Sequence, residues 1–242
     1  MVVNNSSVNF TSRCPHIKDA QWVCHNVAAN FPHISTTRLE PSISRLEDRY
    51  PDVYDEFLSI KPYSPVAFQD ENSNKVMKIF CRMKQLIREL NSIRADRRAF
   101  DDTSFLFIRN ILNRLKVYKL GNCYENAKLS ELILRLNGKK NVYTAAINVG
   151  DRKIDHVVCF YNRDGSPFNG RISKDTIIVD SWLGEADFAD NILVKYRNLY
   201  KDFLFVPAKG KLSFRNVTSL DLSENELIEL AKDFPQLIKK KP

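Results

Sequence analysis

The feature of this sequence that most constrains its fold is a change of hydrophobic pattern near Gly138. Before this residue, apolar side chains recur at intervals of three and four, which is typical of amphipathic helices. After it, short runs rich in β-branched and aromatic residues are typical of strands. Helices followed by strands predict an α+β fold. The helices are expected at residues 17–28, 43–48, 52–59, 73–94 and 103–115.

The strand region begins with a predicted hairpin. Residues 142–149 and 154–161 are the strand candidates, and Gly150-Asp151 between them is a tight-turn signal. Farther on, the sequence Ser-Glu-Asn-Glu at 223–226 has the spacing of a capping box, which predicts the start of a last helix. The other elements expected here are strands at 176–180, 203–206 and 212–217 and a helix at 187–198.

A short loop, residues 121–124 with the sequence Gly-Asn-Cys-Tyr, leads directly into an apolar helix that ends near Gly138. Cys123 opens this helix. The unpaired backbone N–H groups and the positive end of the helix dipole stabilise a thiolate at such a position. Cys123 is therefore a candidate nucleophile.

Two residues of the strand region have the chemistry to support that nucleophile. His156 lies within the strand candidate 154–161, and Asp180 ends the strand candidate 176–180. An imidazole can accept the thiol proton, while a carboxylate on its far side fixes the tautomer and stabilises the imidazolium. Taken singly, each residue also has a structural explanation as part of the core. Their order along the chain and their flanking residues favour a Cys123–His156–Asp180 triad.

The same segments resemble those of the papain-like cysteine peptidases. Residues 121–124 are similar to that family's Gly-Ser-Cys-Trp, residues 155–158 (Asp-His-Val-Val) to its Asp/Asn-His-Ala-Val, and residues 180–182 (Asp-Ser-Trp) to its Asn-Ser-Trp. The resemblance covers about residues 105–207. It implies a papain-like domain in which the helix that bears Cys123 packs on an antiparallel sheet that carries His156 and Asp180.

The sequence departs from the papain pattern in its spacing and in two residues. Papain has roughly 130 or more residues between its cysteine and histidine, whereas positions 123 and 156 are only 33 apart here. Asp180 replaces the family's asparagine, and Val117 stands where the family has its oxyanion glutamine. This compact spacing is similar to the papain-like domains of bacterial effectors, including the YopT-like proteases and the OspI-like glutamine deamidases.

The resemblance implies a role for each matched residue. Cys123 would attack an amide carbonyl, His156 would shuttle the proton, and water or an amine would release the thioester. Asn122 and Trp182 would support the triad, with Trp182 covering the hydrogen bond between His156 and Asp180. No cofactor and no metal are implied.

Together these inferences predict a cysteine protease or protein-glutamine deamidase, a hydrolase that a bacterium secretes into a host as a virulence effector. The acidic stretch 223–229 before a basic C-terminus is similar to type IV secretion signals. The alternatives left open are transglutaminase-type crosslinking and a catalytically degenerate papain-fold binding module. Residues 1–100 are expected to form a helical region for substrate or partner recognition, and residues 101–242 the catalytic domain.

Composition restricts the compartment and the partners. With 242 residues, 43% of them hydrophobic, the chain has no apolar run near the ~20 residues that span a bilayer and no signal peptide at its start, so a cytosolic setting is expected. Five scattered cysteines argue against a disulfide framework, and the spacing of Cys14, Cys24 and the nearby histidines fits no common zinc pattern.

Charge gives a further expectation about partners. The net charge of +8 favours a protein substrate with an acidic surface, which the basic residues of 75–98 are expected to bind. Basic and acidic residues are interspersed along the chain rather than clustered, which argues against a nucleic-acid partner.

Overall fold

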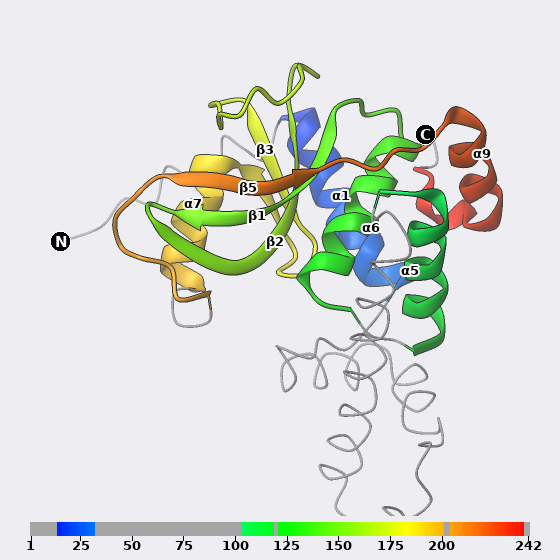
Figure 1. Ribbon diagram of the computed structural model, residues 1–242, viewed down its shortest axis with the longest axis horizontal. Coiled ribbons are helices and arrows are strands. Elements are labelled where there is room, and N and C mark those ends of the chain that lie inside the picture. Colours follow the sequence, from blue (N-terminus) through cyan, green and yellow to red (C-terminus); the bar gives the residue numbers. More distant parts are fainter. Residues whose placement is uncertain (1–13, 32–102, 119–120, 201–203, 240–242) are drawn as a thin grey trace, which may run out of the picture. The chain divides into compact units, whose positions relative to one another are not determined.

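The computed structural model describes residues 14–31, 103–118, 121–200 and 204–239 (Figure 1). The chain divides into two compact units, one of residues 1–30 and 123–242 and the other of residues 31–122. In this division the first helix belongs to the unit that contains the sheet, and residues 101–122 belong to the other unit. The helices predicted at 43–48, 52–59 and 73–94, and the basic residues of 75–98, lie outside the described residues.

The first unit contains a five-stranded antiparallel sheet, so the predicted α+β class is confirmed. Val149 pairs with Arg152 across the turn at Gly150-Asp151, which confirms the predicted hairpin. Gly150 has a φ of 60°, a conformation that glycine adopts without strain. In sheet order the strands are β4 (Glu185–Phe188), β3 (Thr176–Asp180), β2 (Arg152–Asn162), β1 (Val142–Val149) and β5 (Leu212–Thr218).

Helices of the first unit form where the 3.6-residue apolar pattern and the capping signals predict them. The helix predicted at 17–28 packs against β3, β4 and a second helix, and its buried side chains recur at intervals of three and four. The last helix has the complete capping box of Ser223 and Glu226. The helices of this unit are α1 (Pro15–Asn30), α6 (Cys123–Leu136), α7 (Ala189–Leu199) and α9 (Glu224–Asp233), followed by the 3₁₀ turn η4 (Pro235–Leu237).

The second unit contributes one described helix, α5 (Phe105–Tyr118), close to the helix predicted at 103–115. Its buried residues include Phe107, Ile108, Ile111, Leu112 and Leu115, which recur with helical spacing.

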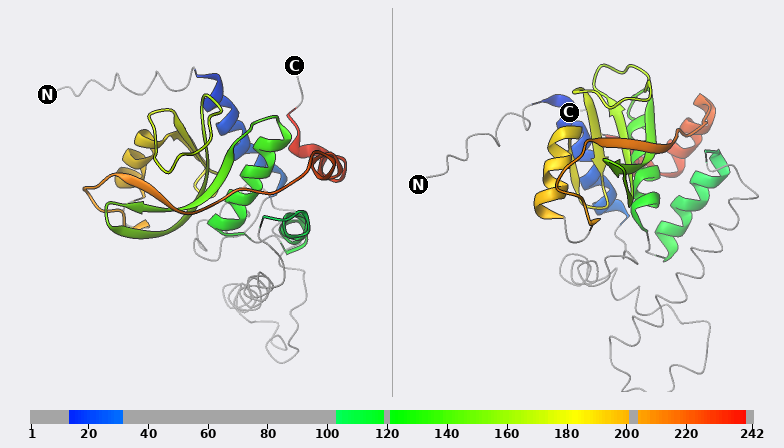
Figure 2. Two further views of the ribbon diagram at one scale, coloured as in Figure 1. Left: turned by 45° about the horizontal axis from the view of Figure 1, so that its top comes forward. Right: turned by 60° about the vertical axis from the view of Figure 1, so that its left-hand side comes forward.

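Both faces of the central strands are covered (Figure 2). Phe160 of β2 shares a hydrophobic cluster with Ile192 and Tyr196 of α7. The neighbouring Cys159 faces the opposite side of the sheet, where it lies near Glu131 of α6. Alternation along β2 therefore places His156, which shares a face with Phe160, on the α7 side.

A buried polar network fixes α6 to the sheet. Glu131, in the middle of α6, is fully buried and accepts hydrogen bonds from the hydroxyl of Thr144 on β1, at 2.8 Å, and from the backbone N–H of Leu220 after β5. The fully buried ammonium of Lys128 lies 3.3 Å from the same carboxylate, and Arg135 forms a longer ion pair with it. These contacts hold the helix that begins at Cys123.

One predicted strand is wrong, and one observed strand was not predicted. The strand predicted at 203–206 is not formed by its described residues, since Leu204 ends a helical turn and Phe205 has a φ of 52°. The short strand β4 was not predicted, whereas the helix expected near 187–198 is confirmed as α7. β4 forms because it pairs with the edge of β3, a tertiary contact that a local pattern does not reveal.

Candidate active site

His156 and Asp180 form a buried pair across two adjacent strands. The imidazole Nε2 of His156 lies 2.6 Å from the carboxylate Oδ2 of Asp180, and the two residues are only 1% and 2% exposed. Residues 159–162 of β2 pair with residues 176–179 of β3 in antiparallel register. Asp180, at the end of β3, therefore lies next to the part of β2 that carries His156. The structure therefore brings together the histidine and the aspartate that the sequence singles out.

Cys123 is the first residue of α6, as the sequence predicts, but its side chain is half-buried rather than exposed. Its side chain packs against the same cluster that contains Trp182 and Tyr196. The thiol lies close enough to His156 to affect the pKa of the imidazole as a hydrogen-bond partner. Because Nε2 is used by Asp180, Nδ1 is the ring nitrogen left for the thiol.

The contact between the thiol and the ring is not a well-aligned hydrogen bond. Nδ1 of His156 is buried and has no hydrogen-bond partner among the residues that the structure describes. The thiol's effect on the pKa of His156 requires only that the two side chains be close, whereas a hydrogen bond also requires alignment. Loose alignment is common in catalytic pairs that tighten only around a substrate.

The pKa of His156 reflects opposing influences. Burial is the largest of them and lowers the pKa, because a dry environment disfavours charge. The charge and hydrogen bond of Asp180 act in the other direction, as does the adjacent Cys123 thiol, and the net result raises the pKa of His156 to about 10. The imidazole is therefore protonated at neutral pH.

The carboxylate of Asp180 has two further hydrogen-bond donors. The hydroxyl of Tyr196, on α7, donates to Oδ2 at 2.7 Å, the same oxygen that bonds His156. The backbone N–H of Leu183 donates to Oδ1 at 3.2 Å. Both carboxylate oxygens are thus engaged, which fixes the orientation of the group that holds the imidazole.

Tyr196 is a site residue that the sequence does not reveal. It lies in the helix expected at 187–198, where an aromatic residue on the apolar face is read as core. Tyr196 is fully buried. The hydroxyl of a buried tyrosine needs a hydrogen-bond partner, so a tyrosine on the apolar face of a helix is the only signal that the sequence offers. Burial and the neighbouring charge of Asp180 raise the pKa of Tyr196 well above its usual range, so the hydroxyl remains a donor.

Two aromatic rings enclose the imidazole. The Trp182 ring lies 5.0 Å from the His156 ring, centroid to centroid, and is tilted by 39°. The Tyr196 ring lies 5.9 Å away in an edge-on arrangement. Trp182 is itself only 8% exposed. The ring of Trp182 therefore lies against the imidazole, and its role in covering the His156–Asp180 hydrogen bond stays a prediction.

The segment that carries Asp180 is also tied to α6. The hydroxyls of Ser130 on α6 and Ser181 lie 2.6 Å apart, and Ser130 also donates to the Asn126 carbonyl. This contact couples the helix of Cys123 to the residue next to Asp180. Asn122, the other predicted supporting residue, is buried immediately before Cys123, and its role stays a prediction.

The described residues do not present an obvious metal site or membrane span. Within them, no group of three or more His, Cys, Asp or Glu side chains is arranged to hold a metal ion. In the same part of the chain, no helix combines the length and apolar character needed to cross a bilayer. Cys14, Cys24, Cys123 and Cys159 are free thiols.

Comparison with known proteins gave no match to a protein-family model, a curated protein or a solved structure. The function of this chain is therefore inferred from the geometry of Cys123, His156 and Asp180 and from the resemblance of their flanking residues to the papain-like peptidases.

Proposed function

We propose that this chain is a papain-like thiol hydrolase, a cysteine protease or protein-glutamine deamidase acting on protein amides. The observation that carries the proposal is the buried 2.6 Å hydrogen bond between His156 and Asp180, which leaves Nδ1 for the thiol of Cys123. A nucleophile, a base and a group that orients the base are the parts that acyl transfer requires.

The resting state is a thiolate–imidazolium pair. With the pKa of His156 raised to about 10, the imidazole is already charged at neutral pH and cannot take another proton. In the proposed mechanism the imidazolium of His156 faces the thiolate form of Cys123, which a neighbouring positive charge favours. Asp180 stabilises the imidazolium, and the N-terminus of α6 stabilises the thiolate.

In the first half-reaction, the thiolate sulfur of Cys123 bonds to the carbonyl carbon of the amide, and the π electrons of the carbonyl move to its oxygen. His156 then donates its Nδ1 proton to the amide nitrogen as the C–N bond breaks. An amine leaves in proteolysis, and ammonia leaves in glutamine deamidation. The product of this step is a thioester on Cys123.

In the second half-reaction, neutral His156 takes a proton from water as the water oxygen attacks the thioester carbon. The C–S bond breaks, the carboxylic acid leaves, and the thiolate–imidazolium pair is restored. If an amine attacks instead of water, the product is a crosslink, so the geometry of the triad is the same for all three activities.

The oxyanion that forms in each half-reaction needs hydrogen-bond donors. The backbone N–H of Cys123 is one candidate, since the first N–H groups of a helix have no partner within it. One such donor is worth about 2.7–4 kcal/mol in comparable enzymes. We further propose that the enzyme acts in a host cytosol as a secreted bacterial effector, which follows from the resemblance.

Intact-mass analysis of host lysate proteins after incubation with the chain tests the proposal. Deamidation, cleavage and crosslinking leave different mass changes, and the account predicts one of them on a protein substrate. The Cys123→Ala variant should leave the lysate unchanged, while Cys159→Ala, a change at a buried cysteine on the far side of the sheet, should remain active. Identical lysate masses with the parent and with Cys123→Ala would exclude the proposed chemistry.

A further inference from the structure

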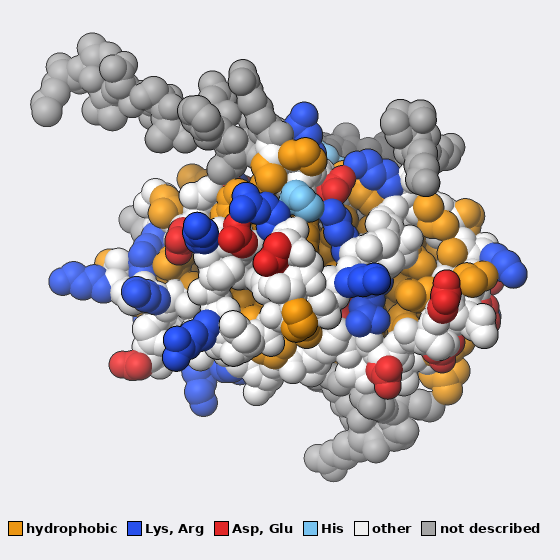
Figure 3. Space-filling model, turned by 90° about the horizontal axis from the view of Figure 1, so that it is seen from above, with side chains coloured by type: hydrophobic (Ala, Val, Ile, Leu, Met, Phe, Trp, Pro, Cys, Tyr) orange, Lys and Arg blue, Asp and Glu red, His pale blue; other side chains and the backbone are white. Residues whose placement is uncertain are grey.

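The tip of the β1–β2 hairpin carries a group of exposed basic side chains. Arg152 and Lys153 begin β2, and Lys209 and Lys211 flank Gly210 in the loop before β5. None of these cations forms an ion pair with another residue that the structure describes. Two exposed acids, Asp151 and Asp155, lie among them, so the four cations outnumber the carboxylates at this end of the hairpin. On the face drawn in Figure 3, basic and acidic side chains are also interspersed.

The loop that carries the two lysines is fixed to the hairpin. The N–H of Gly150 donates to the carbonyl of Lys211 at 2.9 Å. Gly210 packs so closely on Gly150 that a Cβ at position 210 would lie 2.7 Å from the Gly150 nitrogen. The guanidinium of Arg197, on α7, donates to the carbonyls of Pro207 and Gly210. The basic side chains therefore project from a defined backbone.

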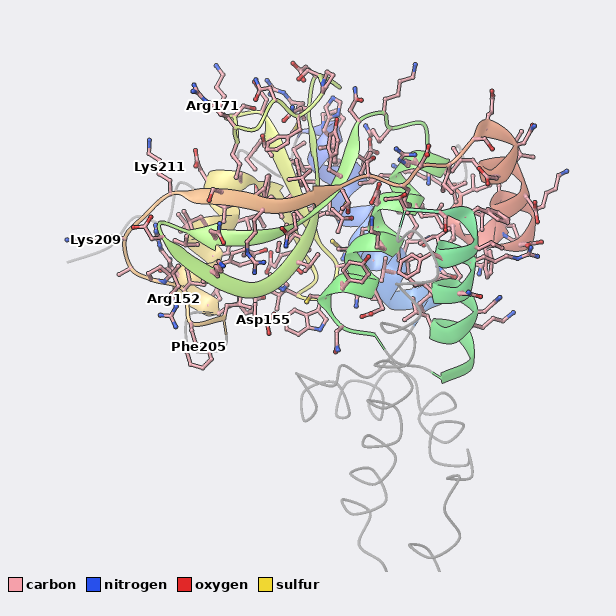
Figure 4. All side chains as sticks on the ribbon, viewed as in Figure 1. Arg152, Asp155, Arg171, Phe205, Lys209 and Lys211 are labelled. Carbon is pink, nitrogen blue, oxygen red and sulfur yellow. The ribbon has the colours of Figure 1, made fainter. Side chains whose placement is uncertain are left out.

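An exposed aromatic residue lies at the same end of the hairpin. Phe205 is 65% exposed, although the residues on either side of it, Leu204 and Val206, are buried in the core. Its φ of 52° is in the left-handed region, which is strained for a bulky side chain. Strained backbone persists where surrounding contacts impose it and is frequent at binding sites. In Figure 4, Arg152, Phe205, Lys209 and Lys211 all extend outward around this end of the hairpin.

This surface, which we name the hairpin-tip surface and define as Arg152, Lys153, Phe205, Lys209 and Lys211, lies near the candidate active site. Arg152 and His156 are on the same strand, and a rise of about 3.3 Å per residue places their Cα atoms roughly 13 Å apart. An extended polypeptide of a few residues spans that distance.

We propose that the hairpin-tip surface binds an acidic segment of the protein substrate, with an apolar side chain of that segment against Phe205. This proposal rests on the proposed function, because a polypeptide is the partner that a nearby amide-cleaving site requires. Unpaired cations attract acidic side chains and speed their encounter, while an exposed ring offers apolar contact area. The surface differs from the residues 75–98 that the sequence favours for the same task.

Peptide binding to the full-length Cys123→Ala variant tests the proposal. The probe is a fluorescein-labelled peptide of alternating Glu and Gly with one central Phe, followed by fluorescence anisotropy. Combined charge reversal of Arg152, Lys153, Lys209 and Lys211 to Glu should weaken binding by about tenfold or more. Phe205→Ala should weaken it by a smaller factor, and added salt should weaken binding to the parent surface.

A matched control separates this surface from general charge. Reversal of Lys18, Lys140, Lys174 and Lys232, which are exposed on other elements of the same unit, changes the net charge by the same amount and should alter binding by no more than about twofold. Equal loss in both sets of variants would overturn the proposal. Tighter binding of a single-stranded DNA or of phosphatidylserine vesicles than of the peptide, at equal salt, would also overturn it.

The result is independent of catalysis, because the Cys123→Ala variant does no acyl transfer. A chain that modifies lysate proteins while the acidic peptide fails to bind would refute the docking proposal alone. A chain that binds the peptide but leaves lysate proteins unchanged would refute the proposed function alone.

Discussion

The carboxylate of Asp180 can hold the imidazole of His156 in a fixed orientation only if the carboxylate itself is held in place. Tyr196 donates to the oxygen that bonds His156, at 2.7 Å. The change Tyr196→Phe removes this donor and keeps the ring, so we expect kcat for the protein substrate to fall about tenfold with KM little changed, the equivalent of one hydrogen bond to a charged group. Tyr200→Phe, which removes a hydroxyl bonded to Glu185, is the matched control and should leave kcat near the parent value.

A double-mutant cycle separates positioning from general destabilisation. If Tyr196 acts through Asp180, the change Tyr196→Phe should have little further effect on kcat in an Asp180→Ala background. Additive losses in the cycle would show that Tyr196 supports the fold rather than the carboxylate.

The raised pKa of His156 also predicts a pH dependence of stability. The folded value of about 10 exceeds the ordinary value of 6.5, so the folded state holds a proton that the unfolded state releases between these values. This contribution to stability is complete below pH 6.5 and is lost as the pH rises through 10, with a slope of up to about 1.4 kcal/mol per pH unit.

Urea denaturation at a series of pH values measures that slope. We expect the free energy of unfolding of the parent to fall more steeply across this range than that of His156→Gln, which carries no titrating imidazole. Parallel curves for the two proteins would mean that the pKa of His156 is not raised in the folded state.

Some residues of the site can be predicted from the sequence, and others cannot. Cys123, His156, Asp180 and Trp182 each lie in a short segment whose neighbours carry information about local structure, and the structure places His156 beside each of the other three. Tyr196 could not be predicted, because its role exists only once α7 packs against β3 and β4. Its hydroxyl meets Asp180 through tertiary packing.

Among the elements, α6 matters most to the site because it carries Cys123. Its central residue Glu131 receives hydrogen bonds from β1 and from the segment after β5, beside the buried ammonium of Lys128. Glu131→Ala leaves that ammonium unpaired in the interior, and we expect the free energy of unfolding to fall by about 3–5 kcal/mol in urea denaturation.

Removing the unpaired ammonium of Lys128 should recover part of the lost free energy of unfolding. The double variant with Lys128→Met and Glu131→Ala should therefore be more stable than Glu131→Ala alone, since an apolar side chain fills the space without a charge. A double variant that is no more stable would indicate that the hydrogen bonds that the Glu131 side chain accepts from Thr144 and Leu220, rather than its pairing with Lys128, hold α6.

Elements with strong local patterns can be predicted from the sequence, whereas elements that form only through pairing with a neighbouring strand cannot. β3 has the predicted bounds because every residue from Thr176 to Asp180 is buried, as its apolar run suggests. β4 has only four residues and exists through its pairing with β3. At 203–206 an apolar run resembles a strand, yet Leu204 and Val206 are buried individually while Phe205 projects outward.

At the scale of the molecule, the sheet-bearing unit is closed by segments from both ends of the chain. Asn26, on α1, donates to the carbonyl of Gln236, and Lys239 lies 2.9 Å from the carboxylate of Asp19. The sequence predicts the helix at 17–28 and its packing on the body, but it cannot identify these partners. They are more than 200 residues away in the chain, and no local pattern links them.

The proposed chemistry requires that Cys123 and His156 form a thiolate–imidazolium pair held by Asp180. The most direct measurement is the rate at which iodoacetamide alkylates Cys123 as a function of pH, followed by peptide mass mapping. Cys14, which is also half-buried, is the internal reference, while burial raises the pKa of Cys24 to about 12 and keeps that thiol inert. The account predicts that Cys123 reacts rapidly from mildly acidic pH upward, where Cys14 reacts slowly, and that His156→Ala shifts the reaction of Cys123 to alkaline pH. Equal pH profiles for Cys123 and Cys14, or a profile that His156→Ala leaves unchanged, would contradict it.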